Sequence, residues 1–481
     1  MSRIMRETHA VQRSFRGGRA ALSIVALAGT AAATGCGGIL DVPPLAGVQA
    51  ASALQNRSGA IGMYTTAKNR LFGAIGGAEN IVELGGLMTD EYVFAVRDIA
   101  NIDARRTAKI GTYGERGNTA LQGVLAGRSQ LQTAERSIRQ YGDPGDQWMR
   151  GEAYALVGYA ELYLAETFCA GVPLSRWLPD GGVEYGGALS TDSLLAIAAA
   201  HFDTALTLAD TSGVVKSLAN LGLARARLDR GQFDAAKTAA AAVPTGFVYN
   251  AEIPTQYVGS GNDINMYSKP AYSNCTYFNP GDHEGGTGLG FVSANDPRLV
   301  FQTTTTKTCD YQFGNTTTPA YYLKPVKFGP TLIPIATGAE ARLIQAEAAL
   351  RAGQVPEWRD RLNALRDSAP QTYLLAASAM APLTADSTTG ASGTLQVDVM
   401  FRERAFWLFG TGTRLGDLRR LIRQYNRTAE SVFPTGTYAG GTNATFTTYG
   451  ADVSVTLPTA ASGLVTDNPN YQGCTAPTTA G

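Results

Sequence analysis

The chain has 481 residues, which is long enough for one large core or for two to three domains. Its 40 basic and 40 acidic residues cancel, and this balance excludes the strongly basic surface that nucleic-acid-binding proteins carry. Hydrophobic residues make up 44%, so the chain is not wholly disordered. Only three histidines occur, so we expect no metal centre, and no motif indicates a cofactor.

The first 35 residues have the pattern of an export signal. Five arginines precede an apolar stretch of sixteen residues, Ala20 to Gly35, whereas a membrane-spanning helix needs about 20. The stretch ends in small residues directly before Cys36 and resembles a bacterial lipobox. We therefore expect cleavage before Cys36 and acylation of its thiol, since two or more acyl chains hold a protein stably at a membrane. A plain secretory signal with an incidental cysteine is the alternative.

Four further cysteines remain: Cys169, Cys275, Cys309 and Cys474. An even number in an exported protein suggests two disulfides, and four cysteines allow three connectivities. We favour Cys275–Cys309, which closes a loop around one polar segment, together with Cys169–Cys474. Unpaired buried thiols are the alternative. No C-x-x-C pair exists, which argues against zinc-binding and thioredoxin-like motifs.

A tether over 36–50, with two adjacent prolines, leads into a helical part over 51–244. Apolar residues at helical spacing predict one helix over 152–168, which ends at Gly171 and Pro173, and another over 192–209. A helix–turn–helix over 216–243 turns at Gly231 and resembles a tetratricopeptide unit. A second unit over 340–367 turns at Gly353, within a helical C-terminal part over 336–427.

Two segments have a different texture. Helical periodicity disappears over 245–335, where Gly, Asn, Thr and Tyr accumulate, and a Thr- and Gly-rich stretch over 428–481 is similar. Both predict long loops with short strands on a helical scaffold, where binding surfaces commonly lie. The predicted fold class is therefore mainly α, a scaffold of tetratricopeptide-like helical pairs with a loop-rich insertion.

Catalytic motifs are weak. Asp282, His283 and Glu284 are consecutive, but they lie in a Gly-rich loop with no second histidine at helical spacing. The GTGLG run over 286–290 lacks the spacing of a dinucleotide-binding fingerprint, and no G-x-S-x-G elbow occurs. We expect Arg298 and the charges of 401–421 to be structural, since a buried arginine prefers a bidentate carboxylate partner.

Six segments in this order resemble the SusD/RagB family of outer-membrane nutrient-binding lipoproteins, over residues 36–474. They are the lipobox with ILDVPP, RGEAYALVGYAELYLAETFCAGVPLS (150–175), NDPRLVFQ, EARLIQAEAALRAG before LNALRD, FRERAFWLFGTGTRLGDLRRL (401–421) and TLPTAASGLVTDNPN (456–470). The resemblance implies a lipid-anchored protein on the outer face of the outer membrane. It would cover a TonB-dependent, SusC-like β-barrel transporter and deliver bound glycan or peptide to it without breaking bonds.

Family members bind sugar rings with exposed aromatic side chains, so the resemblance points to tyrosines of the insertion as ligand-binding candidates: Tyr257, Tyr267, Tyr272, Tyr277, Tyr311, Tyr321 and Tyr322. Two other functions stay open. One is a helical-repeat adaptor of the outer membrane with no small ligand. The other is a surface glycoside hydrolase, which would need two carboxylates about 5–9 Å apart in a cleft.

Overall fold

The computed structural model describes residues 54–77, 80–94, 115–178, 181–253, 278–299, 301–304, 320–323, 332–368, 380–385, 393–436, 448–457 and 467–479. All of them belong to one unit of the chain, Ala51–Gly481. The predicted signal, Cys36 and the tether lie outside the described residues. None of the described helices is long and apolar enough to cross a membrane.

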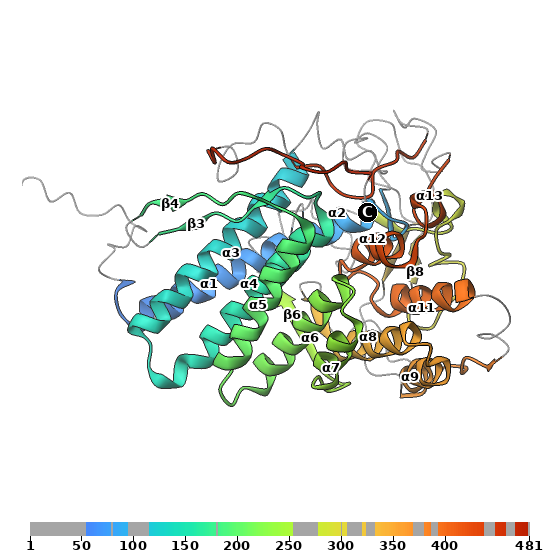
Figure 1. The fold of residues 1–481 in the computed structure, drawn as a ribbon, viewed down its shortest axis with the longest axis horizontal. Coiled ribbons are helices and arrows are strands. Elements are labelled where there is room, and N and C mark those ends of the chain that lie inside the picture. Colours follow the sequence, from blue (N-terminus) through green and yellow to red (C-terminus); the bar gives the residue numbers. More distant parts are fainter. Residues whose placement is uncertain are drawn as a thin grey trace, which may run out of the picture. The chain divides into compact units, whose positions relative to one another are not determined.

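The N-terminal part is a layer of antiparallel helices. It contains α1 (Arg57–Gly76), α2 (Ile81–Leu87), α3 (Glu115–Tyr141), α4 (Gln147–Thr167) and α5 (Thr191–Leu208). In Figure 1, α1, α3, α4 and α5 run side by side, and α3 packs on both α1 and α4. The predicted helices over 152–168 and 192–209 correspond to α4 and α5.

Two glycines allow α5 to pack closely against its neighbouring helices. Phe202 of α5 is fully buried against two glycines, Gly158 of α4 and Gly222 of α6 (Gly213–Asp229). A Cβ atom would lie 2.7 Å from the Phe202 ring at Gly158 and 2.2 Å from it at Gly222. Any larger residue at either position would therefore displace this ring from the core.

Two helical pairs confirm the tetratricopeptide-like units. The first is α6 with α7 (Phe233–Ala241), and the second is α8 (Gly338–Arg351) with α9 (Val355–Ser368). The turns have the same geometry, with φ of +71° at Gly231 and +72° at Gly353. In each, the amide after the glycine donates to a carbonyl five residues earlier, at 2.8 Å from Gln232 and 2.9 Å from Gln354. This is the Schellman pattern, in which glycine tolerates the left-handed backbone.

The insertion is closed at its neck by a pair of strands. β6 (Val248–Glu252) and β10 (Leu332–Thr337) pair antiparallel, so the chain leaves and re-enters the scaffold at one place. Gly338 N–H donates to the Phe247 carbonyl at 2.7 Å, and a Cβ there would lie 2.2 Å from the Pro244 oxygen. This neck brings α7 against α8, so the two pairs stack although their turn glycines are 122 residues apart.

Short elements complete the described chain. Two hairpins between α4 and α5, which the sequence did not predict, pair β2 (Val172–Pro173) with β5 (Ala188–Leu189) and β3 (Arg176–Trp177) with β4 (Val183–Glu184). The insertion contributes β7 (Phe278–Pro280), which pairs with β1 (Tyr92–Phe94), and β8 (Phe301–Thr304), which pairs with β9 (Ala320–Leu323). The C-terminal part adds α11 (Gly393–Trp407), α12 (Arg414–Tyr425) and α13 (Ala429–Val432). Short 3-10 turns lie at Pro144–Asp146 and Glu284–Gly286.

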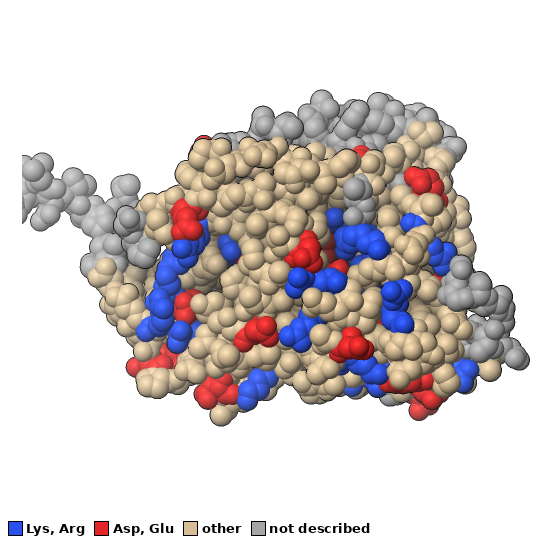
Figure 2. Space-filling view, in the orientation of Figure 1, with Lys and Arg blue, Asp and Glu red and all other residues tan. Residues whose placement is uncertain are grey.

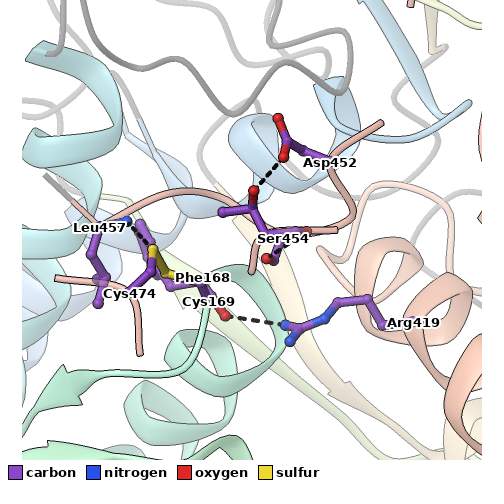
Figure 3. Close-up of a disulfide and its surroundings, with 8 residues drawn as sticks. Phe168, Cys169, Arg419, Asp452, Ser454, Leu457 and Cys474 are labelled. Atoms are coloured by element: carbon purple, nitrogen blue, oxygen red, sulfur yellow. Dashed lines mark hydrogen bonds between the residues drawn. A yellow bond between two sulfur atoms is a disulfide. The ribbon is translucent and has the colours of Figure 1, made fainter. Parts of the chain in front are cut away.

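A disulfide joins Cys169 to Cys474, with Cα atoms 5.6 Å apart (Figure 3). This is one of the two pairings favoured from the sequence, whereas Cys275 and Cys309 lie outside the described residues. Hydrogen bonds reinforce the link: Cys169 N–H donates to the Val455 carbonyl at 2.9 Å, and Thr475 N–H donates to the Ala170 carbonyl at 2.8 Å. The C-terminal segment is therefore fastened to the end of α4.

Replacing both cysteines, Cys169→Ser with Cys474→Ser, should lower the free energy of unfolding by about 2–5 kcal/mol, because the link spans 305 residues and restricts the unfolded chain strongly. Urea denaturation of the oxidised proteins measures this loss. Limited proteolysis should also cut the variant first within 467–479. A variant as stable as the parent would show that the link does not stabilise the fold.

Candidate functional site

The structure places the seven candidate tyrosines only in part. Tyr257, Tyr267, Tyr272, Tyr277 and Tyr311 lie outside the described residues. Tyr321 and Tyr322 lie on β9, where they pair in register with Thr303 and Gln302 of β8. β9 also lies against β7. The hairpin that carries these two tyrosines therefore adjoins the strand that connects the insertion to β1.

The described part of the insertion next to this hairpin is residues 278–299, here called the insertion base. Its first anchor is Asp90, which follows α2 and is fully buried. Asp90 accepts two hydrogen bonds from Arg414 of α12, both 2.7 Å, and a third from the amide of Leu289 at 2.9 Å. The neighbouring Glu91 carbonyl accepts from Gly281 N–H at 2.9 Å. One carboxylate thus joins the insertion base to α12.

Arg298 is the second anchor, and it has the carboxylate partners that the sequence predicted. Its guanidinium donates to Asp296 at 2.8 and 2.7 Å and to Glu403 of α11 at 2.8 and 3.2 Å. Burial alone would raise the pKa of Asp296, but the charge and hydrogen bonds of Arg298 lower it. Arg366 of α9 also donates to Glu403, at 2.7 Å. The NDPR segment is therefore structural and fixes this end of the insertion base to α11.

The third anchor is aromatic. The fully buried ring of Phe291 packs on Phe406 at 5.2 Å and on Phe409 at 5.0 Å between ring centroids. Tyr92 of β1 meets Phe409 edge-on at 5.7 Å. Aromatic residues of 401–421 thus form the apolar surface against which the insertion base packs.

The consecutive residues Asp282, His283 and Glu284 have structural partners, and Ser293 is shared by Asp282 and His283. Asp282 Oδ1 accepts from the amides of Val292 and Ser293 at 3.1 and 3.0 Å and closes the loop. His283 has a positive φ of 59° and its Nε2 lies 3.1 Å from Ser293 Oγ. Glu284 accepts from the Tyr449 hydroxyl. Within the described ranges, no group of three or more His, Cys, Asp or Glu side chains could hold a metal ion.

A buried network of charged side chains connects α12 with α11, α8 and α6. Asp417 of α12 accepts from Arg404 at 2.8 Å and from Arg420 at 2.7 Å. Arg420 also binds Glu347 of α8 and lies 3.3 Å from Asp229 of α6. Burial would raise the pKa of Asp417, but the two guanidinium groups lower it to about 2. The structural role expected for the charges of 401–421 agrees with these contacts.

Two further buried groups have strongly shifted pKa values. Burial raises the pKa of Glu91 to about 8, although the Gly410 amide, 2.7 Å from Oε1, and Arg414 lower it. Burial lowers the pKa of Arg419 to about 9. Arg419 Nη1 donates to the Ala165 carbonyl at 2.8 Å and to the Phe168 carbonyl at 3.2 Å, both at the end of α4. Figure 3 shows the bond to Phe168. The side chain of Arg419 thus satisfies the free carbonyl groups at the C-terminal end of α4.

Solved structures with the same fold are SusD-like proteins. A SusD superfamily protein from Bacteroides vulgatus has a TM-score of 0.56 at 15% identity, over 77% of this chain and 89% of that one. A SusD-like carbohydrate binding protein from Bacteroides vulgatus gives 0.51 at 17% identity, over 76% and 83%. A SusD superfamily protein from Bacteroides thetaiotaomicron gives 0.53 at 15% identity, over 74% and 88%. No protein-family model matches the chain, and no curated protein does.

Asp90→Asn should lower the free energy of unfolding by about 3–5 kcal/mol, because it leaves the buried Arg414 charge without its carboxylate. Urea denaturation measures the loss. Glu184→Gln is the matched control, since it removes a carboxylate from an exposed pair with Arg176 and should cost under about 1 kcal/mol. Equal losses in the two variants would contradict the anchoring role of Asp90.

Glu91→Gln should flatten the pH dependence of stability. The native carboxyl keeps its proton up to a pKa of about 8, whereas the unfolded one releases it near 4.5. Between these values the native state binds more protons, so the free energy of unfolding falls as pH rises, by at most about 1.4 kcal/mol per pH unit. The uncharged amide removes this contribution, and urea midpoints across that range measure it. An unchanged slope would refute the raised pKa.

Proposed function

We propose that this chain, which has the fold of SusD-like proteins, is a lipid-anchored glycan-binding protein of the outer cell surface. It captures a glycan with its insertion and passes it to a TonB-dependent β-barrel transporter of the SusC type, without breaking bonds. Oligopeptide is the alternative cargo. The anchor in this proposal is an acylated Cys36, followed by the short tether over 36–50.

The observation that carries the proposal is the way in which the insertion is mounted. Its neck is closed by β6 and β10, and its base is held by Asp90, Arg298 and Phe291, all of which are buried. Binding surfaces commonly consist of loops that a rigid scaffold positions. A long, Tyr-rich insertion on a fixed base therefore suits the capture of an extended ligand such as a glycan.

Two further observations support binding rather than hydrolysis. One of the solved structures with this fold is named a carbohydrate binding protein. Two of the carboxylates that lie beneath the insertion base are held by arginine, Asp90 by Arg414 and Glu403 by Arg298. A carboxylate in such a pair is stabilised in its charged form and is poorly suited to act as a general acid.

Affinity electrophoresis against a panel of polysaccharides, with calorimetry for oligopeptides, tests the proposal. We expect at least one glycan to retard the purified chain, and chromatography of the incubated glycan to show no products. Tyr321→Ala or Tyr322→Ala should weaken binding about 5- to 30-fold, since a central contact is worth about 1–2 kcal/mol. Tyr141→Ala, on α3, is the control and should leave the affinity unchanged.

Purification from detergent-solubilised membranes tests the anchor and the partner. The expected result is a chain that begins at an acylated Cys36 and recovers a β-barrel protein in equal amount. If chromatography of the incubated glycan instead showed cleavage products, the chain would be a glycoside hydrolase. A chain that binds neither glycan nor peptide but recovers membrane proteins would establish the adaptor function.

A further inference from the structure

A second candidate site lies away from the insertion base, among α3, α4, α5 and β3. There a cavity of about 270 Å³ is open to the surface. Its lining includes Arg136 and Arg139 of α3, Tyr154 of α4, Arg176 of β3 and His201 of α5. In Figure 2 a line of mostly basic side chains, with acidic ones at its top and within it, crosses this side of the molecule, over α3 and the β3–β4 hairpin of Figure 1. None of these residues belongs to the insertion.

The charges around the cavity do not balance. Its one acidic lining residue, Glu135, is already bound to Arg150, 2.9 Å away. Arg176 pairs with Glu184 at 2.6 Å. Arg139, on the exposed rim, has neither a hydrogen bond nor an ion pair to any side chain that the structure describes.

Arg136 is the second guanidinium that lacks a described carboxylate partner. It donates only to neutral oxygens, Thr133 Oγ1 at 3.0 Å and the Trp177 carbonyl at 2.9 Å. Burial lowers its pKa, and the positive charges of Arg176 and Arg139 lower it further, although Glu135 opposes this shift. Positive charge is thus concentrated in a partly enclosed, low-dielectric cavity, and such a cavity attracts anions.

The opposite wall of the cavity is aromatic and held in place. The rings of Tyr154 and His201 lie 5.9 Å apart at an interplanar angle of 33°. His201 Nδ1 lies 2.7 Å from Glu161, which also accepts from Arg128 at 2.7 Å. Glu161 is therefore occupied by these two partners, and the carboxylate that fixes the histidine ring does not neutralise the arginines on the rim.

We propose that this cavity binds a small ligand through an oxyanion group, a carboxylate, sulfate or phosphate, held by Arg136 and Arg139 with the ring of Tyr154 beside it. Guanidinium groups bind such planar or tetrahedral oxyanions with charge-assisted hydrogen bonds. The volume lies just below the usual range of about 300–1,000 Å³ for ligand pockets, so it fits one acidic sugar unit or an inorganic anion. The site goes beyond the proposed function and does not depend on it.

Isothermal titration calorimetry of the full chain at constant ionic strength tests this site with four probes: glucuronate, sodium sulfate, inorganic phosphate and glucose. We expect at least one oxyanion to bind and glucose not to bind. Arg139→Gln should weaken that binding at least tenfold. Because Arg139 is exposed and forms no hydrogen bond or ion pair with a described side chain, its replacement should not disturb folding. Lys216→Gln, which removes an exposed positive charge on α6, is the matched control and should change the affinity less than twofold.

Comparison of the probes distinguishes an acidic sugar from an inorganic anion as the ligand. Glucuronate bound more tightly than sulfate and phosphate supports an acidic sugar, and equal affinities support an inorganic anion. The proposal is overturned if no oxyanion binds, if glucose binds as well as glucuronate, or if Arg139→Gln and Lys216→Gln behave alike. The polysaccharide affinity of Arg139→Gln, measured in parallel, should equal that of the parent, so failure here is distinguishable from failure at the insertion.

Discussion

The pairing of buried arginines with carboxylates is the constraint on which the rest of this fold depends. Arg420 of α12 is fully buried between Asp417 and Glu347, and Arg404 of α11 donates to the same Asp417. A buried charge is tolerated only when its partners are in place, and removing one partner leaves the other uncompensated. These contacts therefore specify how α8, α11 and α12 meet, beyond what apolar packing alone would require.

The same helices also hold the insertion. Arg414 begins α12 and binds Asp90, while Glu403 lies on α11 and binds Arg298. The buried ion-pair network and the contacts to the insertion base thus share the same two helices, α11 and α12. Any displacement of α12 would move the insertion base, so the position of residues 281–299 depends on buried ion pairs of the scaffold.

Local patterns in the sequence were sufficient to predict the helical scaffold. Apolar spacing predicted α4 and α5, and the glycines at 231 and 353 predicted the two turns because the left-handed position at the end of a helix favours glycine. The arginine of NDPR was correctly expected to find carboxylates. The two-residue strands of the hairpins between α4 and α5 were missed, since two residues carry no periodicity.

The partners in long-range ion pairs could not be predicted, unlike the Cys169–Cys474 pairing. Asp90 meets Arg414 across 324 residues, and nothing in the sequence around Asp90 distinguishes it from an exposed carboxylate. The cavity beside α3 was missed for the same reason, because Tyr154 and His201 come from different helices and converge only after folding. The insertion tyrosines were named from a family resemblance, and only the backbone of β9 places two of them.

Hydrogen–deuterium exchange of the intact chain tests most directly whether the insertion base is part of the buried core. Peptides that cover 281–299 should exchange as slowly as those from α12, because amides such as that of Leu289 are bonded to Asp90. Both sets should become exposed together as urea is added. Rapid exchange across 281–299 while α12 stays protected would contradict the account, because the insertion would then be fastened to the scaffold only at its neck.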